Sequence, residues 1–96
     1  MISSESLIKG KTYYLIGFYD DALKIPDIET YIYVGKNLLS DDGAWYFQCP
    51  QTFLKQGPFN ELPPGDYSVM RADEDTLEMM YDSQGIVNLL TNLQEA

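Results

Sequence analysis

The stretch GAWYFQCPQTFLKQGP, residues 43–58, decides how this chain folds. Its first part alternates, because Trp45 and Phe47 fall on one side of an extended backbone and Tyr46 falls on the other. This period of two, carried by aromatic side chains, is typical of a strand. We therefore predict a strand over residues 44–48.

The second part of the same stretch has the punctuation of a short helix. Pro50 suits the first helical position, where its missing N–H is not needed. Gly57 suits the left-handed position just past a helix, and Pro58 prevents the helix from continuing. A short helix directly after the strand is the expected arrangement.

Residues on both sides of this unit predict further strands. Aromatic and β-branched residues favour strands at 11–19 and 29–36, with an acidic loop between them. After the short helix, segments 66–71 and 76–81 favour a second hairpin, with Tyr67, Val69, Leu77, Met79 and Tyr81 as its apolar positions.

The end of the chain changes from strand to helix periodicity. Ile86, Leu89, Leu90 and Leu93 recur at helical spacing, which predicts an amphipathic helix. Asp82 or Ser83 is expected to cap its first turn. The fold class is therefore α+β: one domain over residues 1–96, with a mostly antiparallel five-stranded sheet. A strongly coiled or partly closed barrel is the alternative, since the strands are short and contain glycines.

The charge of the chain restricts its partners. Fifteen acidic against six basic residues give a net charge of −9. Such a protein repels nucleic acid and anionic membranes, because binding to phosphates depends on cationic side chains. A protein partner with a basic surface is expected instead, since its approach would be accelerated by the field. The competing interpretation is that the charge serves solubility.

The residue inventory argues against catalysis. The chain has no histidine, which removes the commonest general base and metal ligand. Cys49 is the only thiol, so no internal disulfide forms and a reducing compartment fits. We expect no enzyme activity, no cofactor and no bound metal. No signal peptide or membrane span is indicated, and the predicted location is the cytoplasm.

Two acidic segments make up the candidate binding site. If the strand after the short helix runs antiparallel to the strand at 44–48, Asp41 and Asp42 lie at the same end of the sheet as Asp73, Glu74 and Asp75. Uncompensated carboxylates repel one another, so such a rim is either a solvated edge or a docking surface for Lys and Arg. Leu38 and Leu39, beside the first pair, are the candidate apolar anchors of that surface.

Part of the chain resembles a pattern found in small uncharacterised bacterial proteins. The segment TYIYVGKNLLSDDGAWYFQCPQTFLKQGPF carries this pattern as Y-V-G-x-N-L, an acidic loop, W-Y-F-Q, a short helix and G-P. In general type, short, acidic and β-rich, the chain is similar to bacterial immunity proteins, which neutralise toxin domains. The resemblance implies an inhibitor or immunity-type binding module. Two alternatives remain: an assembly subunit that forms homo-oligomers through its sheet, and a small enzyme that uses Cys49 or a carboxylate.

Overall fold

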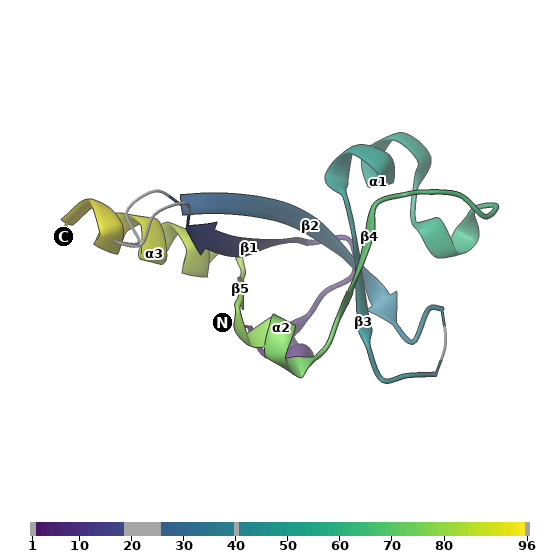
Figure 1. Cartoon of the computed structure of the whole chain (residues 1–96), viewed down its shortest axis with the longest axis horizontal. Helices are drawn as coiled ribbons and strands as arrows, with labels where there is room; N and C mark the ends of the chain where they lie inside the picture. Colours follow the sequence, from purple (N-terminus) through teal and green to yellow (C-terminus); the bar gives the residue numbers. More distant parts are fainter. Residues whose placement is uncertain (1, 19–25, 40, 96) are drawn as a thin grey trace.

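A computed structural model of the chain describes residues 2–18, 26–39 and 41–95 (Figure 1). The loop predicted between the first two strands falls largely outside these residues. The strands are β1 (Thr12–Phe18), β2 (Pro26–Lys36), β3 (Trp45–Gln48), β4 (Val69–Ala72) and β5 (Met80–Tyr81). The helices are α1 (Pro50–Gln56), α2 (Glu74–Glu78) and α3 (Ser83–Glu95), with single 3-10 turns η1 (Ser4–Ser6) and η2 (Phe59–Glu61).

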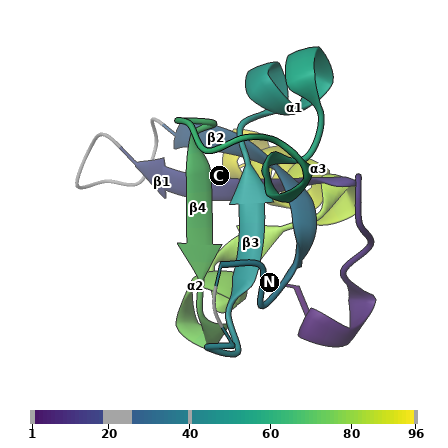
Figure 2. The same cartoon turned by 90° about the vertical axis from the view of Figure 1, so that its right-hand side faces the viewer.

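The five strands form one antiparallel sheet in the order β4-β3-β2-β1-β5. With the short helix after β3 and the C-terminal helix, this is the predicted α+β fold. The sheet is open, with β4 and β5 at its two edges, so the barrel alternative is wrong. Figure 2 shows β3 and β4 side by side, with α1 beyond one end of the pair and α2 at the other.

The segment 43–58 folds as predicted. All four residues of β3 are buried. Trp45 and Phe47 belong to a core on one face of the sheet, while Tyr46 belongs to a core on the other face. Pro50 begins α1, and the N–H of Gly57 ends it by donating to the carbonyl of Phe53 at 2.8 Å.

The two cores are covered by different parts of the chain. Leu7 from the N-terminal segment and Leu77 from α2 pack against the core that contains Phe47. Phe53 from α1 and Phe59 from η2 pack against the core that contains Tyr46. Burial of aromatic and aliphatic side chains on both faces is the main stabilising contribution to this half of the molecule.

Gln48 is fully buried at the end of β3 and ties the sheet to α1. Its Nε2 donates to the Thr52 hydroxyl and to the Gly57 carbonyl, both at 3.1 Å. Its Oε1 accepts from the Phe59 N–H at 2.8 Å. The side chain thereby provides hydrogen-bond partners for the Gly57 carbonyl and the Phe59 N–H. Leaving a buried backbone group without a partner costs more free energy than one hydrogen bond contributes.

The predicted hairpin over 66–71 and 76–81 is wrong. β4 pairs with β3 and β5 pairs with β1, so the two segments lie at opposite edges of the sheet. The acidic stretch between them begins a helix, because the Asp73 side chain accepts from the Thr76 N–H and caps α2. Upstream, Ser68 has a positive φ of 56°, which breaks the extended backbone and delays the strand to Val69.

The C-terminal helix is confirmed over Ser83–Glu95. Asp82 precedes it and accepts from the Gly85 N–H at 2.7 Å, as an N-cap does. Ile86 is buried and Leu89 and Leu90 are half-buried; the side chain of Leu93 lies outside the described part of the chain. α3 packs on β1 and β5, and Figure 1 shows it alongside β1 at one end of the molecule, which measures 46 × 26 × 22 Å.

Candidate protein-interaction surface

The two acidic segments lie at the same end of the sheet. β3 and β4 are antiparallel, with Trp45 opposite Ala72. The loop that enters β3 and the helix that follows β4 therefore meet at one end, where Figures 1 and 2 both show them. The antiparallel pairing of these two strands is the condition under which the sequence predicts that the acidic segments share one end of the sheet. We call Asp41, Asp42, Asp73, Glu74 and Asp75 the acidic rim.

Asp42 stabilises the loop that enters β3. Its Oδ1 accepts from the Ala44 N–H at 3.0 Å, and its Oδ2 accepts from the Tyr46 hydroxyl at 2.9 Å. The same Oδ2 forms an ion pair with Arg71 Nε at 2.8 Å. Arg71 lies opposite Tyr46 in the sheet, so Asp42 links the loop to β3 and β4. The hydrogen bond to this carboxylate also raises the pKa of the Arg71 guanidinium.

Asp73 has a second structural role, at the start of α2. Its Oδ1 accepts from the N–H and the hydroxyl of Thr76, at 2.9 and 3.0 Å. The backbone hydrogen bond from Thr76 is the main reason why the pKa of Asp73 is lowered. The remaining members, Asp41, Glu74 and Asp75, are exposed. The rim thus combines two carboxylates that build the fold with three that face solvent.

The two candidate anchor leucines differ in burial. Leu38 is half-buried against the core that contains Tyr46. Its Cδ2 approaches Gly35 so closely that a Cβ added there would lie 3.1 Å away. Leu39 is 69% exposed, although it lies on the same loop. Leu38 therefore supports the loop, and Leu39 faces solvent.

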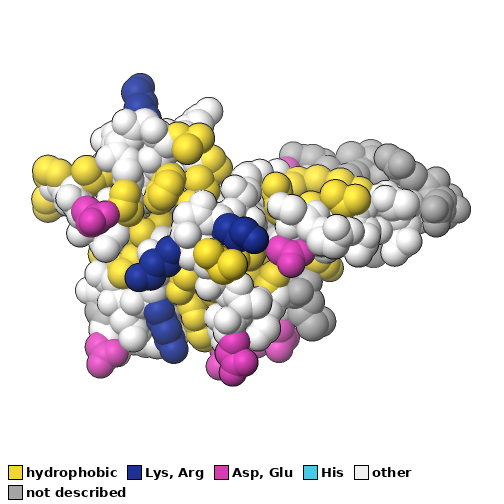
Figure 3. Space-filling view, turned by 180° about the vertical axis from the view of Figure 1, so that it is seen from behind, with side chains coloured by type: hydrophobic (Ala, Val, Ile, Leu, Met, Phe, Trp, Pro, Cys, Tyr) yellow, Lys and Arg dark blue, Asp and Glu magenta, His cyan; other side chains and the backbone are white. Residues whose placement is uncertain are grey.

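Leu38 and Leu39 border an apolar groove of about 370 Å³. We call it the apolar groove; besides these leucines its walls include Phe59, Leu62, Pro63, Pro64 and Tyr67. The Tyr67 hydroxyl donates to the Pro63 carbonyl, which fixes one wall. Exposed carboxylates on Glu61 and Asp66 stand in the same loop region. In the rear view of Figure 3, hydrophobic side chains gather at the left, where η2 and the following loop lie.

The far wall of the groove was not predicted from the sequence. Leu62, Pro63 and Pro64 have no strand or helix periodicity, so they carry no core signal. Their only signal is an apolar run of low helix and strand propensity between two acids, Glu61 and Asp66. Such a run is typical of a fixed loop with exposed apolar surface. Its position opposite Leu39, across the groove, depends on the tertiary structure and cannot be read from the sequence.

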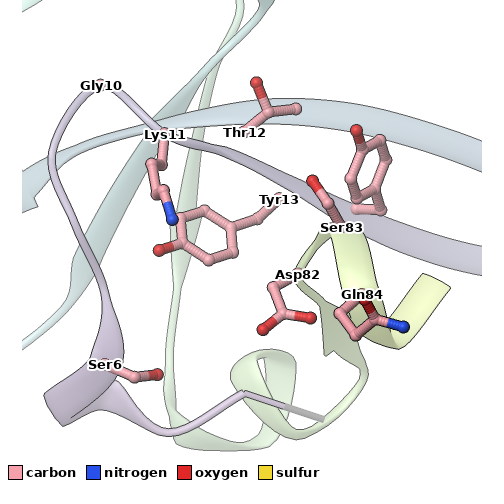
Figure 4. Close-up of a pocket in the computed structure, with 9 residues that line it drawn as sticks. Ser6, Gly10, Lys11, Thr12, Tyr13, Asp82, Ser83 and Gln84 are labelled. Carbon is pink, nitrogen blue, oxygen red and sulfur yellow. The ribbon is translucent and has the colours of Figure 1, made fainter. Parts of the chain in front are cut away.

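A polar cavity of about 660 Å³ lies between β1 and the start of α3 (Figure 4). Lys11, Tyr13, Asp82 and Ser83 are among its lining residues. Two of these groups already serve the local structure: the Tyr13 hydroxyl accepts from the Ile8 N–H, and Asp82 caps α3. The cavity therefore lies where the N-terminal segment, β1 and the start of α3 meet.

Cys49 lies at the N-cap position of α1 and is half-buried. It borders an open groove of about 470 Å³ together with residues of β2 and β4. The described side chains include no group of three or more Cys, Asp and Glu residues placed to hold a metal ion. Within the same residues, no helix combines the length and hydropathy needed to cross a bilayer.

No protein-family model, no curated protein and no solved structure matches this chain.

Proposed function

We propose that this protein is a non-enzymatic binding module of the inhibitor or immunity type, which docks on a basic surface of a partner protein. The observation that carries the proposal is the placement of Leu39, 69% exposed, on the loop that also carries Asp41. An apolar side chain beside carboxylates complements a partner surface on which Lys and Arg surround an apolar spot.

The charge distribution supports this proposal. Fifteen acids against six bases give a field that attracts a cationic surface from a distance. Asp41, Glu74 and Asp75 face solvent at one end of the sheet, so a single partner surface can contact all of them. Steering of this kind raises the association rate and weakens as salt screens the charges.

The apolar groove supplies the short-range part of the contact. Its volume of about 370 Å³ lies at the lower end of the range for ligand sites, which fits a few side chains. Interface energy concentrates in such partly enclosed apolar spots, while charged rims mainly set orientation and rate. Leu39 is expected to contribute the most affinity and the acids the most salt dependence.

Affinity capture at low salt from extract of the source cells tests the proposal. The bait variants are the wild type, a rim variant with Asp41→Asn, Glu74→Gln and Asp75→Asn, and a groove variant with Leu39→Ser. The expected result is a basic protein retained by the wild type and lost from both variants. Asp42 and Asp73 stay unchanged because they hold the loop and α2.

A charge-matched control variant, Asn88→Lys with Thr91→Lys and Asn92→Lys, changes the net charge equally, but its exposed positions lie on α3, which packs on β1 and β5 away from the rim. It should retain the same basic protein. Equal loss from both charge variants, or no retained protein at low salt, would contradict the proposal. The self-assembly alternative predicts a stable homo-oligomer in dilute solution, which sedimentation velocity detects without a partner.

A further inference from the structure

β2 is the longest of the described strands, and β3 covers only part of one of its edges. β2 pairs with β1 from Pro26 to Ile32, but its pairing with β3 begins only at Ile32, opposite Gln48. Beyond Gln48 the chain turns away into α1. Figure 1 shows this part of β2 extending past β3, with β1 along its lower side.

The direction of the backbone groups on this segment follows from one residue. The Tyr33 N–H donates to the Lys11 carbonyl at 3.0 Å, and the Tyr33 carbonyl accepts from the Gly10 N–H at 2.9 Å. Tyr33 therefore faces the β1 side. Because backbone groups along an antiparallel strand point alternately to its two neighbours, Ile28 and Thr30 direct their N–H and C=O groups to the open side.

This open edge continues into the groove next to Cys49. The groove of about 470 Å³ lies between Glu29–Tyr31 of β2 and Ser68–Met70, which lead into β4. It occupies the line along which β3 would run if it did not turn at Cys49. An extended segment that paired with Ile28 and Thr30 would enter it end-on and place a side chain near Val69 and Met70.

The charge of the edge selects the occupant. Asp27 and Glu29 share one face of β2, and Glu29 is exposed. Antiparallel pairing with a second copy would bring Glu29 close to Glu29 of that copy, and like charges directly opposite destabilise a sheet. A segment with Lys or Arg at alternate positions places cations opposite the same carboxylates, which stabilises the pairing.

We propose that the open edge of β2, Asp27 to Thr30, binds an extended, basic polypeptide segment by strand addition, with backbone hydrogen bonds to Ile28 and Thr30. Main-chain pairing supplies affinity in this mode, and alternate side chains supply specificity. The site is separate from the acidic rim and the apolar groove, so it stands independently of the function proposed above.

A capped peptide that alternates lysine and valine is the probe. Titration followed by ¹H–¹⁵N spectra should give saturable shifts at Ile28 and Thr30, and amide exchange of these two N–H groups should slow. The same peptide with N-methyl groups on its edge-facing amides keeps the charge but cannot pair. It should bind at least about tenfold more weakly, since the hydrogen bonds that its amides would donate to the Ile28 and Thr30 carbonyls are lost.

Two variants of the protein complete the test. Thr30→Pro removes an N–H that points to the open side and makes no hydrogen bond to β1, so the edge position tolerates the proline. This variant should bind the peptide about tenfold more weakly, and its far-UV circular dichroism spectrum should be unchanged. The rim variant with Asp41→Asn, Glu74→Gln and Asp75→Asn should bind the peptide as the wild type does. Equal binding of the N-methylated peptide, or shifts confined to the acidic rim, would overturn the proposal. So would concentration-dependent dimerisation abolished by Thr30→Pro, since the occupant would then be a second copy.

Discussion

The two ends of β2 have different surroundings. Toward Lys36, β2 pairs with β3, Tyr33 also bonds to Gly10 and Lys11 just ahead of β1, and Ile32, Tyr33 and Val34 are buried. Toward Pro26 it pairs only with β1 among the described residues, and Ile28, Glu29 and Thr30 are exposed. The same strand is thus core at one end and surface at the other.

The difference arises from where β3 turns. Pro50 and the buried Gln48 commit the chain to α1, so the sheet gains two covered faces around β3 and loses a neighbour for the rest of β2. Stability is therefore expected to concentrate around β3, while the open part of β2 is left for binding.

Phe47→Ala should cause the largest loss of stability. Phe47 is fully buried, and its ring packs edge-on or tilted against Tyr13, Tyr31 and Tyr33 at centroid distances of 6.1, 6.5 and 5.4 Å. Removal of a buried phenyl ring costs about 3–5 kcal/mol of unfolding free energy. Urea unfolding measures this loss. The matched control Ile28→Ala, at a side chain 38% exposed, should cost less than about 1 kcal/mol; similar costs at both positions would contradict the contrast.

Gln48→Leu should come next. The leucine fills nearly the same volume but leaves the Phe59 N–H and the Gly57 carbonyl without the hydrogen bonds that Gln48 provides. Buried unsatisfied groups cost about 1–3 kcal/mol each, so a total of about 3 kcal/mol is expected in the same unfolding experiment. Gln84→Leu on the exposed surface of α3 is the control and should be nearly neutral. An unchanged midpoint for Gln48→Leu would show that these backbone groups find other partners.

Local signals predicted the β3 half of the fold well. The residues from Trp45 to Gly57 carry an alternating pattern, a proline at the first helical position and a glycine past the last one, and each signal has a single structural outcome. The antiparallel arrangement of β3 and β4, which the sequence left as a condition, places Asp41 and Asp73 at one end of the sheet.

The second half contained conflicting signals. Leu77, Met79 and Tyr81 alternate as in a strand, yet Met79 is 55% exposed, and the buried pair is Leu77 and Met80, three residues apart. Asp73 followed by two acids is a helix start, and this capping signal outweighed the alternation. The apolar groove and the open edge of β2 were beyond sequence analysis, because both depend on which segments end early in three dimensions.

The smallest effect is expected at the border between the two ends of β2, at Tyr31. Burial is the main cause that raises its pKa to about 12, followed by the hydrogen bond that its hydroxyl donates to Glu29. An unfolded tyrosine titrates near pH 10. Because the folded pKa is the higher one, Tyr31 contributes stability that is complete below pH 10 and is lost as the pH rises toward 12.

Alkaline titration followed by phenolate absorbance should therefore show a late component to which Tyr31 contributes, together with Tyr33, whose pKa burial also raises. Tyr31→Phe should reduce this late component by one tyrosine and make the decline of stability between pH 10 and 12 less steep. Glu29→Gln keeps an acceptor but removes the charge, so it should shift the component to lower pH without abolishing it. A late component unchanged in both variants would mean that Tyr31 behaves as an exposed phenol. The buried half of β2 would then end at Ile32 rather than at Tyr31.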